Sequence, residues 1–182
     1  SNVSVTESGT GLRHSHTVAP TISSHHTPDQ IPKQTVVTVD GGITTTQADS
    51  ANRTYDTLGR LLTSNVSVTE SGTGLSHAYT VSTTISSYNN LNQVLQQATT
   101  TIDGGITTPQ TDSANRTYDT LGRLASSNIS ISQSGTGLSH TYSAATTVNG
   151  YNTLNQITKQ TVATIDGGIT TTQTDSATNL RT

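Results

Sequence analysis

The chain contains no cysteine, methionine, phenylalanine or tryptophan. Without cysteine, no disulfide framework can hold the fold together, and the absence itself indicates no particular compartment. The only aromatic side chains are six tyrosines. Apolar residues make up 29% of the chain, against about 45–50% in ordinary globular domains. The sequence therefore predicts no thick hydrophobic core.

Charge is also scarce, because only 10% of the residues are charged and the formal net charge is −3. This balance gives nucleic acid or an anionic membrane surface little to bind, so we expect neither as a partner. No apolar run approaches the roughly 18 residues that a membrane span needs. No signal peptide is recognisable, and the chain begins at Ser1 without methionine. We expect a mature fragment or an excerpt of a longer protein.

Serine and threonine are abundant and together supply 63 of the 182 residues. Disordered chains combine low hydrophobicity with high charge, and this chain has the first property without the second. Threonine, valine and isoleucine are β-branched residues that favour strands. The composition therefore favours ordered β structure over disorder.

The sequence repeats with a period of 63 residues. The segment Asp40–Leu75 is identical to Asp103–Leu138 at 28 of 36 positions. Such a period is typical of repeat architectures. We predict a partial and variant first unit at 1–54, a second unit at 55–117 and a truncated third unit at 118–182. We expect these three units to form one continuous array, without a separate globular domain.

The first unit differs from the others at one stretch. His25 and His26 stand where later units have Tyr-Asn, and Pro20, Pro28 and Pro32 cluster around them. Proline lacks the N–H donor of a strand ladder. We therefore expect residues 20–33 to be the least regular part of the chain.

Apolar residues alternate with polar ones within each unit, as at Leu75, Tyr79, Val81 and Ile85. A period of two places such residues on one face of a sheet, and the spacing fits a helix poorly. The sequence predicts an all-β fold of tandem antiparallel β-hairpins, two per unit, with arms of about 10–13 residues. Paired side by side, they would form a continuous coiled or spiralling strip of the repeat or solenoid kind.

Glycine-rich segments mark one set of hairpin turns, because glycine accepts the positive φ that tight turns need. The predicted turn residues are Asp40, Gly41, Gly42, Gly72, Gly74, Asp103, Gly104, Gly105, Gly135, Gly137, Asp166, Gly167 and Gly168.

A tyrosine hexad marks the opposite set of turns and recurs every 30 or 33 residues. Two copies read Tyr-Asp-Thr-Leu-Gly-Arg and two read Tyr-Asn-x-Leu-Asn-Gln. We expect the arginine to bind turn carbonyls or the hexad aspartate, and Tyr118 and Leu121 to pack on the neighbouring corner. The hexad residues are Tyr55, Asp56, Leu58, Gly59, Arg60, Tyr88, Asn89, Leu91, Tyr118, Asp119, Leu121, Gly122, Arg123, Tyr151, Asn152 and Leu154.

The hexads at Tyr55 and Tyr118 resemble the Tyr-Asp (YD) repeat, or Rhs repeat, of large bacterial surface and secreted toxin proteins, and those at Tyr88 and Tyr151 match it in part. Teneurins carry related repeats. The resemblance implies strips of β-hairpins, secretion or surface exposure, and in toxin-bearing members a shell around a cargo polypeptide. The hairpins here are longer than the family's unit, the repeats are more uniform, and large aromatics are missing.

Histidine recurs once per unit at His14, His77 and His140, which raises the alternative of a metal ladder. Equivalent residues lie about four strands apart, or roughly 19 Å, whereas zinc binds its ligands at about 2 Å. We favour a half-buried polar role beside Tyr79 and Tyr142. Nothing resembles a nucleophile elbow, and no helix follows the glycine-rich segments as a phosphate loop requires. We expect no enzyme, catalytic residue, metal or cofactor.

Five Asn-x-Ser/Thr sequons offer candidate glycosylation sites at Asn2, Asn52, Asn65, Asn115 and Asn128. Such sequons arise readily by chance in a chain this rich in serine and threonine. The hydroxyl-rich face could instead carry O-linked sugar or form hydroxyl ladders across strands.

The function that we expect is an extracellular structural repeat protein forming a fibre, stalk or surface filament, located outside a bacterial cell or on its surface. Its partner would be itself, as further repeats or copies along a filament, with glycans as a further class of partner. The alternatives are a segment of a YD/Rhs shell that encloses or delivers a toxin, and a carbohydrate-binding adhesin.

Overall fold

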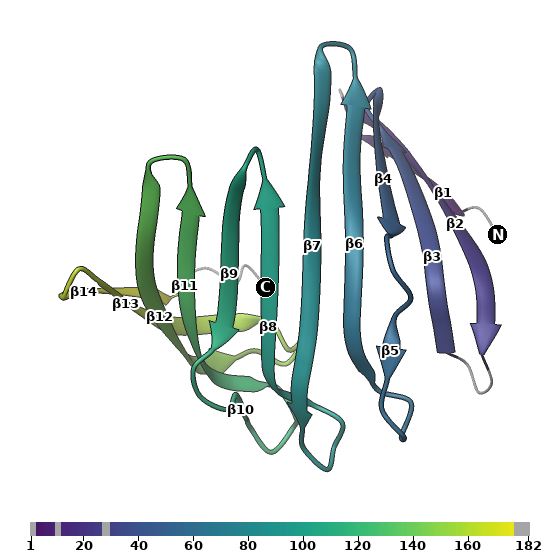
Figure 1. Cartoon of the computed structure of the whole chain (residues 1–182). Helices are drawn as coiled ribbons and strands as arrows, with labels where there is room; N and C mark the ends of the chain where they lie inside the picture. The colour runs from purple at the N-terminus through teal and green to yellow at the C-terminus, as the bar shows by residue number, and fades with distance from the viewer. Residues whose placement is uncertain (1–2, 10–11, 27–29, 177–182) are drawn as a thin grey trace. The chain divides into compact units, whose positions relative to one another are not determined.

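The computed structural model describes residues 3–9, 12–26 and 30–176, with side chains described for 18–22 and 30–175 (Figure 1). The described residues form strands and turns, so no helix among them is long and apolar enough to cross a membrane. The strands are β1 (Val3–Gly9), β2 (Leu12–His26), β3 (Gln30–Asp40), β4 (Ile43–Asp49), β5 (Thr54–Tyr55), β6 (Leu61–Gly72), β7 (Leu75–Tyr88), β8 (Val94–Asp103), β9 (Ile106–Asp112), β10 (Thr117–Tyr118), β11 (Leu124–Gly135), β12 (Leu138–Tyr151), β13 (Ile157–Asp166) and β14 (Ile169–Ser176).

The chain divides into two compact parts, which are described separately. The first part comprises Ser1–Thr84 and Thr101–Gly105, and the second comprises Ile85–Thr100 and Ile106–Thr182. In the first part the strand order is β1-β2-β3-β4-β6-β7, with β5 paired to β6. In the second part it is β8-β9-β11-β12-β13-β14, with β10 paired to β11. The coarse prediction of an all-β fold built from antiparallel strands is confirmed.

The alternating sequence of β7 produces two unequal faces. From Leu75 to Ile85 every second residue is less exposed than its neighbours, and Ile85 is buried. Buried apolar side chains among the described residues are few, namely Val68, Ile85 and Ile131, and none is completely enclosed. Stability must therefore come mainly from cross-strand side-chain pairs and strand ladders rather than from a thick core.

Turns with glycine at positive φ join the two strands of each hairpin at one end of the strands. Gly41 and Gly42 have φ values of 54° and 80° and connect β3 to β4, whose end residues Asp40 and Ile43 pair. A two-residue turn with positive φ at both positions matches the right-handed twist of its strands. The turn after β6 is Thr73-Gly74, and Gly74 has φ 76°. Gly72 instead ends β6 and pairs with Leu75, so its place is in the strand.

The later turns repeat this arrangement. Gly104-Gly105 and Gly167-Gly168 lie at the tips of their hairpins, all with positive φ, and Gly137 has φ 74°. Gly135 ends β11 and pairs with Leu138, as Gly72 does in the preceding unit. Asp103 and Asp166 are the last residues of their strands and flank the turns. In Figure 1 such tight turns join β6 to β7 and β11 to β12.

Two features of the strands differ from the predicted arms of 10–13 residues. β7 and β12 have 14 residues, whereas β4 and β9 have seven and are followed by the short strands β5 and β10. The interruption begins at Asp49 and Asp112, whose side chains turn inward.

The stretch 20–33, which we expected to be the least regular part of the chain, is strand at its described residues. Pro20 lies within β2 opposite Val36, and Pro32 lies within β3. The pairing accommodates this segment through register shifts between Ile22 and Ser24 and between Ser24 and His26. Residues 27–29 lie outside the described part of the chain.

Candidate functional site

The hexads form the turns at the ends of the strands opposite the glycine turns, and each such turn is here called a corner. The aspartate of the hexad shapes the corner. Asp119 Oδ1 accepts hydrogen bonds from the N–H groups of Leu121 and Arg123, each at 2.9 Å. The backbone closes the same loop, since Asp119 N donates to Arg123 O at 2.8 Å and Gly122 N to Asp119 O at 2.9 Å. Gly122 has φ 78°, a left-handed conformation that favours glycine.

Arg123 adds an ion pair to this loop. Its Nε lies 2.7 Å from Asp119 Oδ2, which is one of the two bonding partners that the sequence indicated for this arginine. Donation from the Arg123 backbone N–H, from its guanidinium and from Leu121 N–H lowers the pKa of Asp119, against an opposing effect of desolvation. The corner at Asp56 repeats these contacts, with Arg60 Nε 2.6 Å from Asp56 Oδ2 and a lowered pKa for Asp56.

The Asn/Gln corners build the same loop without charge. Asn152 Oδ1 accepts from Leu154 N–H and Gln156 N–H at 2.9 Å each, and Asn152 Nδ2 donates to Gln156 Oε1 at 2.8 Å. Asn155 takes the left-handed position with φ 60°. The corner at Asn89 has the same bonds to Leu91 and Gln93. Asparagine tolerates this conformation best after glycine, which accounts for the Gly-to-Asn exchange.

The hexad tyrosines fasten each corner to a neighbouring strand. Tyr118 Oη donates to Val94 O at 2.5 Å, and Val94 is the first residue of β8. Tyr151 Oη donates to Leu124 O at 2.6 Å, and Leu124 is the first residue of β11. In the first part, Tyr55 Oη donates to Ile31 O at 2.7 Å. Tyr118 and Tyr151 therefore each hold the beginning of the strand that follows the previous corner, and Tyr55 holds the beginning of β3.

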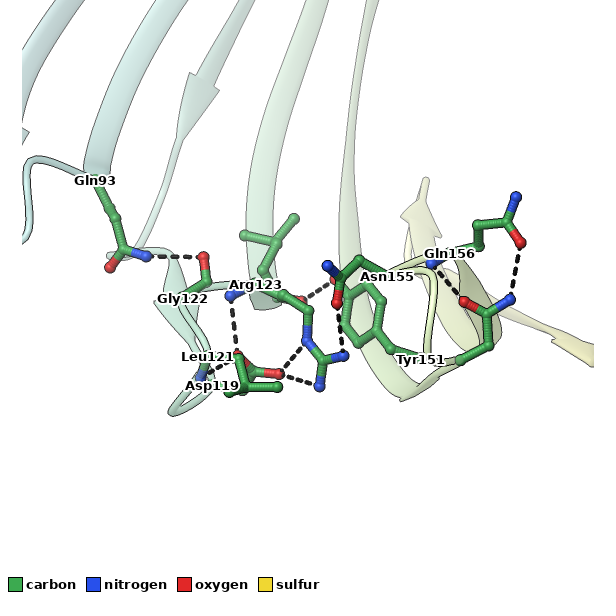
Figure 2. A network of polar contacts seen from close by, with 10 residues as sticks. Gln93, Asp119, Leu121, Gly122, Arg123, Tyr151, Asn155 and Gln156 are labelled. Atoms are coloured by element: carbon green, nitrogen blue, oxygen red, sulfur yellow. Dashed lines mark hydrogen bonds and ion pairs between the residues drawn. The ribbon is translucent and has the colours of Figure 1, made fainter.

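The corners of the second part also contact one another directly, as Figure 2 shows. Gln93 Nε2 donates to Gly122 O at 2.8 Å. Further along, Arg123 Nη1 donates to Asn155 Oδ1 at 3.3 Å, and the guanidinium lies 4.3 Å from the centroid of the Tyr151 ring. A cation over an aromatic face is attracted to it. Polar and cation–π contacts therefore link three successive corners.

The hexad leucines are the exception to this mutual contact. The expectation that Leu121 packs on the next corner is wrong, because its exposed fraction is 73%. The leucine occupies the outermost position of the loop, where its N–H points inward to the carboxylate and its side chain points outward. The other hexad leucines have exposed fractions of 72–75%, and they are Leu58, Leu91 and Leu154.

A second polar cluster, which sequence reasoning missed, explains the interruption of the arms. Asp112 is buried, and its Oδ2 accepts from Gln97 N–H at 2.8 Å and from Arg116 Nε at 3.0 Å. The carboxylate thus accepts the Gln97 N–H in the place of a backbone carbonyl from a neighbouring strand. Beside it, Ser113 N–H donates to Asn128 O and Arg116 N–H donates to Leu95 O. The same set occurs in the first part around Asp49, Arg53 and Gln34. The repeated Asp-Ser-Ala-Asn-Arg segment was the signal available in the sequence.

A small cavity adjoins each of these aspartates. The cavity at Asp49 measures about 30 Å³ and that at Asp112 about 20 Å³, and equivalent residues line both. Gln34, Gln47 and Arg53 in the first correspond to Gln97, Gln110 and Arg116 in the second. Each has room for one water molecule and polar groups to bind it. Their size and position beneath the interrupted arm indicate a structural role.

The recurring histidines lie near the glycine turns and contact carboxylates. His77 Nε2 lies 2.8 Å from Asp103 Oδ1, and its Nδ1 lies 3.1 Å from Glu70 Oε2. Asp103 first and Glu70 second raise the pKa of His77 above its ordinary value. A raised pKa means that the stabilisation is complete below pH 6.5 and is lost as the pH rises through the folded-state pKa.

His140 keeps one of these two contacts. Its Nε2 lies 2.9 Å from Asp166 Oδ1, whereas Gln133 stands opposite it in the place of Glu70. The rings of His77 and Tyr79, and of His140 and Tyr142, have centroids 5.3 Å apart. The side chain of His14 lies outside the described residues. Among the described residues, no group of three or more histidines and carboxylates could hold a metal ion.

Three of the five sequon asparagines, Asn52, Asn115 and Asn128, are exposed, and Asn65 is half-buried. Asn2 lies outside the described residues. Hydroxyl pairs do cross between strands, as at Thr54 and Thr63 (2.7 Å) and at Thr117 and Ser126 (2.7 Å). Both glycosylation and its absence are compatible with these positions, so glycosylation stays a prediction.

No family model, no curated protein and no solved structure matches the chain.

Proposed function

We propose that the chain is an extracellular structural repeat protein that forms a fibre, stalk or surface filament. The observation that carries the proposal is the contact of each corner with the next in the second part of the chain. Gln93 bonds the corner at Gly122, and Arg123 bonds the corner at Asn155. The most distinctive polar side chains of the sequence are thus engaged in joining one hairpin to its neighbour.

The same motif supports the proposal that the chain is related to the YD/Rhs repeat proteins. In both Asp/Arg corners the tyrosine fastens a strand, the aspartate shapes the loop and the arginine pairs with it. The tyrosine, the aspartate and the arginine of the hexad therefore each have a structural reason to recur. Secretion to a bacterial cell surface follows from this relationship and is part of the proposal.

Electron microscopy of the native material is the direct test. A fibre protein should appear as filaments of uniform width whose length varies from particle to particle. Discrete globular particles would refute the fibre. Labelling of intact cells with an antibody to the repeats tests the location, and reactivity only after lysis would contradict surface exposure.

The second candidate, a YD/Rhs shell that encloses or delivers a toxin, rests on the same hexads. It predicts a different full-length gene, because a shell protein must also encode a plug domain and a cargo. A full-length reading frame with a plug domain and a C-terminal effector would favour the shell, and an uninterrupted series of 63-residue units would favour the fibre.

A further inference from the structure

Only one asparagine of the chain is followed by glycine, at Asn149-Gly150 near the end of β12. The units before it have serine at both places, as at Ser86-Ser87. The amide carbon of an asparagine can be attacked by the main-chain nitrogen of the next residue, which closes a five-membered ring. Glycine has no side chain to obstruct this approach, and its backbone is the most permissive. Asn149-Gly150 is therefore the pair in this sequence best suited to such a ring closure.

Asn149 lies at a bulge between β12 and β13. The register shifts between Val148 and Gly150, so Asn149 is the extra residue of its strand and has no partner in this ladder. A bulge disrupts the ladder locally and leaves its extra residue unpaired. The pairing of β2 with β3 passes over Ser23 in the same way, so the bulge belongs to the repeat and the asparagine to the third unit. Asn149 is also exposed, which gives water access to its side chain.

A hydroxyl of the neighbouring strand bonds the amide of this asparagine. Thr161 Oγ1, in β13, donates to Asn149 Oδ1 at 3.1 Å. The Thr174 hydroxyl lies 3.4 Å from Thr161 Oγ1 and can donate to it in turn. A donor at a carbonyl oxygen stabilises the negative charge that develops there when a nucleophile attacks the carbon. Thr161 thus makes the Asn149 amide a better target for the Gly150 nitrogen.

We propose that Asn149 is a site of spontaneous deamidation in the folded chain, assisted by the Thr161 hydroxyl. The Gly150 nitrogen gives its proton to solvent base and forms a bond to Asn149 Cγ, which closes a succinimide ring. The bond from Cγ to Nδ2 then breaks, and the nitrogen leaves as ammonia with a proton from water. Water opens the ring at either carbonyl carbon. Opening at Cγ gives aspartate, and opening at the main-chain carbonyl gives isoaspartate, in which the chain runs through Cγ.

Both products change the surroundings of a corner. Each adds one negative charge to a chain whose formal net charge is −3. Isoaspartate also lengthens the main chain by one carbon shortly before Tyr151, whose hydroxyl bonds Leu124 O. The modification is a property of the chain beyond the proposed fibre function, and it holds whether or not the chain forms filaments.

Peptide mapping by mass spectrometry tests the site. The folded chain is kept in a warm, mildly alkaline buffer, sampled over days and digested at acidic pH, so that no further deamidation arises during preparation. Conversion of the amide to an acid raises the mass of the peptide, and tandem spectra assign the gain to one asparagine. The Asp-Gly turns can form isoaspartate through the same ring, but without a mass change. A mass gain therefore separates Asn149 from them.

Two variants copy residues found 63 positions earlier and serve as matched controls. Thr161→Ala, which copies Ala98, removes the donor to Asn149 Oδ1. We expect the mass gain at Asn149 to become about fivefold slower, which is the effect of one hydrogen bond on a rate. Asn149→Ser, which copies Ser86, should give no mass gain at this position. Thermal melts show that each variant is folded under the conditions of incubation.

The same incubation in urea provides the reference for the unfolded chain. Thr161 has no fixed position there, so Thr161→Ala and the natural chain should deamidate at equal rates. A fivefold difference in the folded chain that disappears in urea would support both the site and its assistance by Thr161. Equal rates of the two folded proteins would overturn the assistance, and a folded chain without mass gain at Asn149 would overturn the site itself.

Discussion

The corners at Tyr118–Arg123 and at Tyr151–Gln156 turn the chain in the same way with different side chains. In both, the side-chain oxygen of the second residue accepts the N–H groups two and four residues later. In both, the fifth residue is left-handed, as glycine at 122 and asparagine at 155. The ion pair between Asp119 and Arg123 is present in the first and replaced by an amide pair in the second.

The comparison separates what a corner needs from what it adds. An acceptor at the second position and a left-handed residue at the fifth are common to both kinds and set the turn. Charge is an addition with two effects: it lowers the pKa of Asp119 and gives Arg123 its stacking contact with Tyr151. Four sets of substitutions test this division.

The left-handed position should give the largest effect. Alanine at Gly122 must adopt φ 78°, which costs about 1–2 kcal/mol, and its Cβ would lie 2.9 Å from Gln93 Nε2. We expect Gly122→Ala to lower the free energy of unfolding by about that amount in urea denaturation. Gly122→Asn, which copies the other corner, should lose less. Equal losses in the two variants would show that the backbone conformation does not select the residue.

The tyrosine hydroxyl should count equally in both kinds of corner. Tyr118→Phe and Tyr151→Phe each remove one hydrogen bond to a strand carbonyl, at Val94 and Leu124. The expected loss is about 1 kcal/mol in each variant, measured by urea denaturation. A loss confined to Tyr118→Phe would mean that the charged corner depends on its tyrosine in a way that the neutral corner does not.

Removing the charge should leave the turn intact and change its response to acid. The lowered pKa of Asp119 contributes stability that is present above the ordinary value of 3.8 and is lost as the pH falls through the folded-state pKa. The double variant Asp119→Asn, Arg123→Gln copies the neutral corner. It should keep the fold at neutral pH and lose less stability than the natural chain below about pH 4.

Thermal melts of both proteins between pH 7 and pH 2.5 provide the measurement. The reverse double variant, Asn152→Asp with Gln156→Arg, is the matched control and should gain acid sensitivity. Parallel pH profiles for the natural chain and both variants would contradict the assigned role of the ion pair.

The outermost leucine should matter least. Leu121→Ser removes an apolar side chain that is 73% exposed, so the free energy of unfolding should change by less than about 0.5 kcal/mol. Urea denaturation again decides the point. A loss comparable to that of Gly122→Ala would mean that Leu121 has a packing partner after all.

The features that the sequence predicted well are local ones. The Gly41-Gly42 turn and the corner at Asp119 follow from residues within five positions of one another, whose preferences the chain itself displays. The interruption at Asp112 could not be predicted in this way, because its acceptor role depends on Gln97, which is 15 residues away on another strand. The tyrosine bonds span 24 or 27 residues and depend on the register of neighbouring hairpins.

The exposure of Leu121 was mispredicted for a physical reason. A conserved spacing within one chain shows that a residue recurs, but it does not show whether the side chain points inward or outward in a loop. The direction is set by Asp119, which draws the backbone N–H of Leu121 inward. Alternation within strands, as in β7, carries that directional information and gave the correct face.

Strand order has a consequence for how the chain reaches this structure. Within each part, every strand pairs with the next strand in the chain or with the one after it, as β4 does with β6. Closing a short loop costs little conformational entropy. Each strand's partner is close in sequence and is therefore synthesised shortly before or after it. Folding can then proceed hairpin by hairpin as the chain lengthens. The number of repeats can therefore change without altering the steps by which any one of them folds.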